Sequence, residues 1–142
     1  MKNIRKSTWT ALSLLLLMGT LSLFSQGQEN QVKEVSALEA YALMQKNSDN
    51  PDFITIDIRT PVEYKEGRLK GAVNINFFSG TFKEDIAKLD RSKTYLVYCR
   101  SGGRSSQSLS IIKELEFTHI FHMTNGIIEW NVEGLPVEKD GD

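Results

Sequence analysis

The chain contains one cysteine, Cys99, and the residues that follow it are suited to holding an anion. The segment is Cys99-Arg-Ser-Gly-Gly-Arg104-Ser105. Gly102 and Gly103 allow the backbone to adopt positive φ and to turn its amide groups inward. Amide dipoles and a neighbouring arginine, Arg100 or Arg104, favour a thiolate over a neutral thiol. The pattern therefore predicts a thiol whose pKa lies below the free value of about 8.5, so that it is a nucleophile at neutral pH.

A structural role is the alternative for a lone cysteine, since most such residues are small buried hydrophobes. A core cysteine gains nothing from a Gly-Gly turn and two arginines, so the neighbours of Cys99 favour the chemical role. A serine nucleophile at Ser105 has less support, because neither His119 nor His122 is evidently placed as its base. These two histidines are expected on one strand with side chains on opposite faces, and we predict no metal site there.

The elements on either side of the loop must position this cysteine. Residues 94–98 form a short apolar run expected to be a strand, and residues 105–115 are expected to form a helix. The loop then follows the carboxyl end of a strand, where open α/β sheets bind their ligands. The helix would add unpaired N–H groups and the positive end of its dipole to the anion site.

Strands and helices alternate along the rest of the chain. Ser36 and Glu39 form a capping box before an expected helix at 37–46, and Thr60 and Glu63 form another before a helix that stops at Gly67. The other expected elements are strands at 53–58, 72–76 and 119–122, and helices at 82–89 and 127–132. This alternation predicts a single α/β domain with a mainly parallel central sheet and helices on both faces.

Residues 1–27 have the composition of a secretory signal peptide, with three basic residues among the first six and an apolar stretch at 11–24. That stretch is shorter than the roughly 20 residues of a membrane-spanning helix, which disfavours a retained anchor. We expect cleavage near Gly27, a periplasmic or secreted protein, and no membrane contact once the signal is removed. The domain would then be 28–142, with 28–31 as a loose leader.

Charge, length and cysteine content restrict the function further. The chain has 17 Lys and Arg and 18 Asp and Glu. All charged residues in the expected signal peptide are basic, so its removal would lower the net charge. The mature chain would be mildly acidic, which argues against a nucleic-acid partner. About 115 residues are enough for one core and too few for two. A single cysteine forms no internal disulfide, so the fold must be stabilised by packing alone. We expect a monomer.

Three segments resemble, in order, the signatures of single-domain rhodaneses, the thiosulfate sulfurtransferase family. They are Asp57-Ile-Arg59-Thr-Pro-Val-Glu63-Tyr64 with Gly67-Arg-Leu-Lys-Gly71-Ala72-Val-Asn74-Ile, then the loop 99–105, then Gly126-Ile-Ile-Glu-Trp130 with Gly134-Leu-Pro136-Val137. The resemblance implies a rhodanese-like domain in which Cys99 takes a sulfane sulfur from thiosulfate or a similar donor as a persulfide. It would pass this sulfur to cyanide or a thiol. The resemblance implies neither a metal nor an organic cofactor.

The residues expected to bind substrate are those of the loop: Arg100, Ser101, Gly102, Gly103, Arg104 and Ser105. Their amides would stabilise the thiolate and the persulfide in turn. Arg100 or Arg104 could meet the anionic donor, and one of them could instead brace the loop; we favour Arg104 for the donor. By resemblance, Asp57 and Arg59 are structural, with Asp57 bonded to backbone and Arg59 paired to an acid such as Glu63.

Other functions fit the sequence less well. Cysteine-dependent phosphatases and arsenate reductases also hold a thiolate in an arginine-bearing loop, but with five residues between cysteine and arginine, whereas four separate Cys99 from Arg104. A smaller ring of amides fits a sulfur atom better than a phosphoryl group. A noncatalytic rhodanese-type module that binds anions or partners is the alternative from another class, although Cys99 is retained. A thiol redox role lacks a resolving cysteine.

Overall fold

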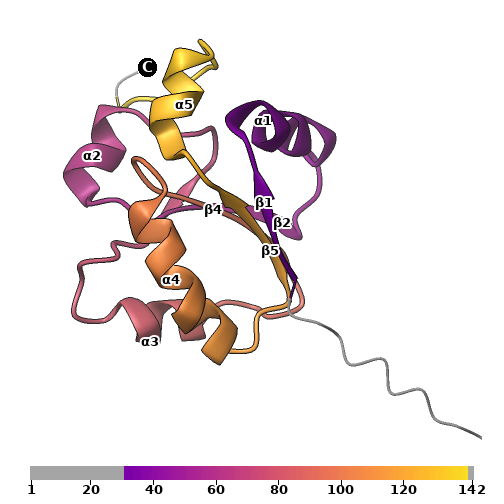
Figure 1. Ribbon diagram of the computed structural model, residues 1–142, viewed down its shortest axis with the longest axis vertical. Coiled ribbons are helices and arrows are strands. Elements are labelled where there is room, and N and C mark those ends of the chain that lie inside the picture. The colour runs from indigo at the N-terminus through magenta and orange to yellow at the C-terminus, as the bar shows by residue number, and fades with distance from the viewer. Residues whose placement is uncertain (1–30, 141–142) are drawn as a thin grey trace, which may run out of the picture.

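The computed structural model describes residues 31–140, and within that range it has a parallel sheet between two layers of helices (Figure 1). The strands are β1 Gln31–Val35, β2 Phe53–Asp57, β3 Val73–Asn74, β4 Thr94–Tyr98 and β5 His119–Met123. The helices are α1 Ala37–Lys46, α2 Pro61–Glu66, α3 Phe82–Ala87, α4 Gly103–Glu114 and α5 Gly126–Val132. Every strand and helix predicted from the sequence is present, with limits within two residues of those expected.

The strand order is β1-β5-β4-β2-β3, and each neighbouring pair is parallel. The predicted α/β fold with a parallel sheet is therefore confirmed. β4 is the central strand, so the residue that follows it lies in the middle of the carboxyl edge of the sheet. This is the edge at which open α/β sheets bind ligands.

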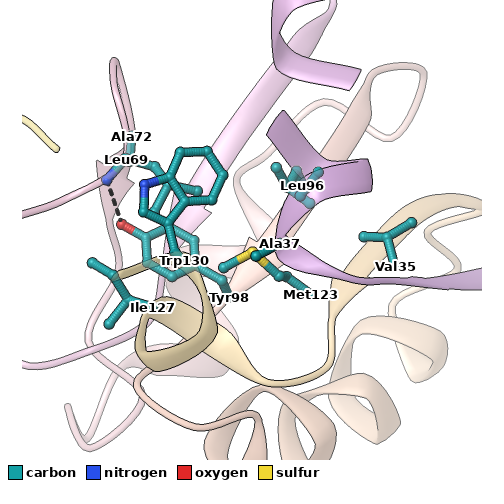
Figure 2. Packing of buried hydrophobic residues seen from close by; sticks show 10 residues of the cluster. Val35, Ala37, Leu69, Ala72, Leu96, Tyr98, Met123, Ile127 and Trp130 are labelled. Atoms are coloured by element: carbon teal, nitrogen blue, oxygen red, sulfur yellow. Dashed lines mark hydrogen bonds between the residues drawn. The ribbon is translucent and has the colours of Figure 1, made fainter. Parts of the chain in front are cut away.

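Helices cover both faces of the sheet, as predicted (Figure 1). Because alternate residues of each strand point to opposite faces, the sheet contributes to two separate cores. Val97 of β4 packs in one core with α3 and α4. Leu96, the residue before it, packs in the other core with α1 and α5. Trp130 of α5 is the largest fully buried side chain of this second core (Figure 2). Its Nε1–H donates to the Pro136 carbonyl at 3.0 Å and ties the closing segment to the domain.

Both predicted capping boxes are present. Ser36 Oγ accepts the Glu39 N–H at 3.3 Å, while a Glu39 carboxylate oxygen accepts the Ser36 N–H at 2.8 Å. Thr60 Oγ1 accepts the Glu63 N–H at 3.3 Å, and Glu63 accepts the Thr60 N–H at 3.1 Å. These bonds satisfy first-turn amides that no intrahelical carbonyl can reach. Local sequence therefore determines where α1 and α2 begin.

The expected loose leader is wrong at its last residue, because Gln31 begins β1. The strand has only two apolar residues, Val32 and Val35, too few for a strong local signal. It forms because each of its residues pairs with β5 along the edge of the sheet. Residues 28–30 and the predicted signal peptide, residues 1–27, lie outside the described residues, and export stays a prediction. No helix within 31–140 is long and apolar enough to cross a membrane.

Candidate active site

Cys99 follows β4 directly, and hydrogen-bond donors from the next turn surround its sulfur. The Gly102 N–H donates to Sγ at 3.1 Å and the Ser105 N–H at 3.5 Å. Ser105 Oγ lies 3.4 Å from the same sulfur atom. Only 1% of Cys99 is exposed, so the sulfur is held inside the domain among polar donors on its loop side. Of the loop amides expected to face the sulfur, those of Gly102 and Ser105 donate to it, while Cys99 also packs in the apolar core shared by α3 and α4.

These donors determine the ionisation of the thiol. Burial raises the pKa of Cys99, but hydrogen bonds from the Ser105 hydroxyl and from the amides of Ser105, Ser101 and Gly102 lower it. The hydrogen bonds outweigh burial, and the pKa of Cys99 lies below its ordinary value. A donor that faces the sulfur is better satisfied by a thiolate than by a thiol, and the thiolate is the nucleophile.

The turn into α5 holds the back of the cysteine loop. The Ile127 N–H donates to the Cys99 carbonyl at 3.0 Å, and the Ile128 N–H donates to the Arg100 carbonyl at 3.1 Å. These two bonds fix the start of the loop against α5. Gly126 makes the contact possible: its φ is 61°, and a Cβ there would lie 2.5 Å from both carbonyl oxygens.

The guanidinium of Arg104 pairs with Glu63 of α2. Its Nη1 and Nη2 donate to the two carboxylate oxygens at 2.7 and 2.6 Å, a bidentate pair. The guanidinium also lies 5.5 Å from the centre of the Phe78 ring. These hydrogen bonds raise the pKa of Arg104, and the negative charge of Cys99 adds to that effect. Arg104 therefore braces the loop against α2 while it places a positive charge near the sulfur.

The same pair makes stability depend on pH. Hydrogen bonds from Arg104 lower the pKa of Glu63 to about 2 from its usual 4.5. Because the folded pKa is the lower one, the stabilisation is complete above about pH 4.5 and is lost as the pH falls toward 2. We expect the difference in unfolding free energy between the protein and Glu63→Gln to be constant near neutral pH and to shrink over this window.

Urea denaturation at a series of pH values measures this difference. Glu66→Gln on the same helix is the control, because it removes a carboxylate from α2 and leaves the Arg104–Glu63 pair intact. A Glu63→Gln difference that does not change between pH 4.5 and 2 would contradict the assigned pair.

A buried ion pair at the end of β2 supports the loop from the neighbouring strand. Asp57 is fully buried, and one of its carboxylate oxygens accepts from Arg59 Nη2 and from the Tyr98 hydroxyl, both at 2.6 Å. The other oxygen accepts the Arg59 N–H at 2.9 Å. The Tyr98 oxygen in turn accepts the Leu69 N–H at 3.1 Å (Figure 2). These contacts give Asp57 and Arg59 a structural role, as expected.

Arg59 pairs with an acid, as expected, but the acid is Asp57 and the suggested partner Glu63 is wrong. Arg59 Nη2 donates to Asp57 and to the Gly67 carbonyl, each at 2.6 Å. Glu63 is bound by Arg104 instead. The sequence places Glu63 four residues after Arg59, but the partner that reaches it comes from α4.

Ser105 has a neighbour that the sequence did not reveal. Its Oγ lies 2.8 Å from Nε2 of His122 on β5. His122 is buried and His119 is exposed, as expected for two side chains that alternate along a strand. From the sequence neither histidine was evidently placed as a base for Ser105, but His122 lies within hydrogen-bond distance of its hydroxyl. The alternation of β5, in which Ile120 and His122 share the face covered by α4, is the signal that could have found this contact.

The other predicted site residues lie on the outside of the loop. Arg100 and Ser101 are exposed, and Gly103 is the exposed first residue of α4. Arg100 borders a cleft of about 380 Å³ beside the loop. The other residues that line this cleft are Arg59, Glu63, Glu66, Gly67, Ile127, Ile128, Asn131, Val137 and Lys139. Cys99 is not among them. No three metal-binding side chains cluster within residues 31–140.

A parallel α/β domain with a cysteine in an amide-lined loop after its central strand is the architecture expected of a rhodanese-like domain. Residues 36–133 match the rhodanese-like domain family, and the chain belongs to it. The resemblance found in the sequence is thereby confirmed.

Known relatives agree with this assignment. A sulfurtransferase of Allochromatium vinosum is 27% identical over 103 residues, which cover 72% of this chain and 94% of that protein. A probable adenylyltransferase/sulfurtransferase MoeZ of Mycobacterium tuberculosis is 35% identical over 75 residues, 53% of this chain and 19% of that protein. The crystal structure of a rhodanese-related protein from Thermoplasma volcanium superposes with a TM-score of 0.61 at 27% identity, covering 75% of this chain and 97% of that one.

Proposed function

We propose that this protein is a sulfurtransferase that carries sulfane sulfur on Cys99 as a persulfide. The observation that supports it most is the contact of the Cys99 sulfur with the Gly102 and Ser105 amides and the Ser105 hydroxyl. These donors lower the pKa of the thiol although it is buried. Relatives named as sulfurtransferases are consistent with this chemistry.

The proposed reaction has two displacement steps at one sulfur atom. The Cys99 thiolate attacks the outer sulfur of thiosulfate; a new S–S bond forms, the S–S bond within thiosulfate breaks, and sulfite leaves with the electron pair. Cyanide or a thiolate then attacks the terminal sulfur, the S–S bond to Cys99 breaks, and the thiolate is regenerated. Both resting states are anions at the loop, so the same preorganised amides stabilise each of them.

In this proposal Arg104 attracts the donor. Because only 1% of Cys99 is exposed, a donor reaches the sulfur only after part of the loop surroundings moves. A thiosulfate dianion competes with the Glu63 carboxylate for the Arg104 guanidinium, since both present oxygens to the same donors. Arg100 is the other candidate, because it is exposed at the adjoining cleft.

Kinetics with variable thiosulfate separate the two arginines. We expect Arg104→Gln to raise the KM for thiosulfate about tenfold or more, since hydrogen bonds to charged groups contribute about 1.5–3 kcal/mol. Arg100→Gln should raise it less. Glu63→Gln is the matched control, because it also breaks the brace but keeps the charge of Arg104. A large rise from Arg100→Gln with none from Arg104→Gln would assign the donor to Arg100.

Intact mass spectrometry tests the function itself. The protein incubated with thiosulfate should gain the mass of one sulfur atom, and cyanide should remove that mass with formation of thiocyanate. If no sulfane donor adds sulfur, the proposal is wrong, and a noncatalytic module that binds anions or partners becomes the better account. If an aryl phosphate is hydrolysed at Cys99 instead, the protein is a phosphatase.

A further inference from the structure

The hydroxyl of Ser105 lies between the Cys99 sulfur and a buried imidazole. Ser105 Oγ is 3.4 Å from Cys99 Sγ and 2.8 Å from His122 Nε2. His122 comes from β5 and is 3% exposed. Its other ring nitrogen, Nδ1, is buried and has no hydrogen-bond partner among residues 31–140. The proposed sulfur transfer has so far given this imidazole no role.

The Ser105 hydroxyl has one proton and three acceptors within reach. These are the Cys99 sulfur, His122 Nε2 and the Gly102 carbonyl at 3.0 Å. The Gly102 carbonyl already accepts the Ser106 N–H at 2.9 Å as the first bond of α4. This carbonyl therefore has the least need of the Ser105 proton. The Cys99 sulfur and the His122 imidazole are the two acceptors that compete for that proton.

The tautomer of His122 decides this competition. If Nδ1 carries the proton, Nε2 accepts the Ser105 proton, the sulfur loses a donor, and a buried N–H has no acceptor. If Nε2 carries the proton, it donates to Ser105 Oγ, and the Ser105 proton is free for the sulfur. The second arrangement makes two hydrogen bonds where the first makes one. Because leaving buried polar groups unpaired is costly, the second is the more stable.

The surroundings of His122 keep the ring neutral. Burial lowers the pKa of His122, and the nearby Glu34 charge and the Gly102 carbonyl raise it by less. Glu34 is the register partner of His122 on β1, and Val97 is its partner on β4. Beyond Glu34, the titratable group linked to the imidazole is Cys99, through Ser105.

We propose that His122 is a positioning residue: its Nε2–H donates to Ser105 and directs the Ser105 proton to Cys99, which stabilises the thiolate. His122 acts through Ser105 and touches no substrate. This role rests on the proposed function, because a stabilised thiolate serves the proposed sulfur transfer. The pKa of the thiol can nevertheless be measured without any sulfur donor. The two proposals can therefore fail separately.

The pH dependence of Cys99 alkylation by iodoacetamide measures the thiol pKa in each variant. Ser105→Ala should raise this pKa by about one unit, the effect of losing one hydrogen bond to a charged group. His122→Leu should raise it by about half a unit, because the hydroxyl loses its orientation. His122→Gln retains an N–H donor and should restore most of that loss. His122→Leu added to Ser105→Ala should cause no further rise.

Three results would overturn the proposal: no rise with His122→Leu, the same rise with and without the Ser105 hydroxyl, or a glutamine variant that behaves like leucine. The second result would mean that the imidazole acts by packing alone. His119→Gln is the matched control on the same strand and should leave the pKa of Cys99 unchanged. If thiosulfate adds no sulfur while the expected shifts are seen, the proposed function fails and the positioning role stands.

Nitrogen-15 NMR of the unsubstituted protein gives a test that does not depend on any variant folding. Nδ1 of His122 should have the chemical shift of an unprotonated nitrogen and Nε2 that of an N–H. The spectrum of His119→Gln assigns the two rings. An Nδ1–H tautomer for His122 would overturn the proposal, because the Ser105 proton would then be bound to the imidazole.

Discussion

Replacing Cys99 by serine is expected to abolish sulfur transfer and to leave the fold intact. A serine hydroxyl is not ionised at neutral pH and forms no persulfide, although it can still accept hydrogen bonds from the Gly102 and Ser105 amides. Removing a catalytic nucleophile lowers turnover by several orders of magnitude, on the order of 10⁴–10⁶. We expect at least a thousandfold slower thiocyanate formation and no gain of sulfur mass, roughly on this scale.

Ser106→Ala is the matched control for that experiment. Ser106 is exposed in the first turn of α4, and only its backbone N–H takes part in the loop, by donating to Gly102. Its loss of a hydroxyl should leave the rate of thiocyanate formation unchanged. Far-UV circular dichroism checks that Cys99→Ser is folded. Sulfur uptake that persists in folded Cys99→Ser would place the sulfur elsewhere and contradict the proposed function.

Gly102→Ala should have the largest effect of any added methyl group in the loop. Gly102 has a φ of 91°, and a Cβ there would lie 1.6 Å from the Thr124 carbonyl oxygen and 2.7 Å from its carbon. The obstacle is backbone, so either the loop or the turn into α5 must shift. Strain of the left-handed backbone conformation at an alanine, together with overpacking against Thr124, predicts a loss of about 2–5 kcal/mol in unfolding free energy. Sulfur loading should fall as well, because the Gly102 N–H moves away from Sγ.

The neighbouring glycine provides a control for stability. Gly103 begins α4, and a Cβ added there has no atom within 4 Å and no positive φ. Gly103→Ala should be neutral or stabilise by up to about 1 kcal/mol, because alanine favours the helix. Urea denaturation measures both variants. Equal and small effects at the two positions would show that the loop does not pass as close to Thr124 as the structure has it.

Local signals in the sequence were enough to predict most of the fold. The capping boxes at Ser36 and Thr60 predicted the starts of two helices, because a cap satisfies amides within one turn of itself. The alternation of strands and helices predicted a parallel sheet, since parallel strands need crossover connections. β1 was missed because its formation depends on pairing with β5, the most distant strand in the sequence.

By itself, the sequence predicted Cys99 as the residue that would bear the proposed chemistry. Cys99, its glycines and its arginines are consecutive, so their joint effect on an anion follows from backbone and charge within one turn. Only the tertiary structure decided that Arg104 binds Glu63, that Arg59 binds Asp57, and that a buried histidine lies behind Ser105. Two of these contacts join different elements, and the third depends on how a guanidinium turns at a strand end. They follow from strand order and side-chain packing, which no local pattern specifies.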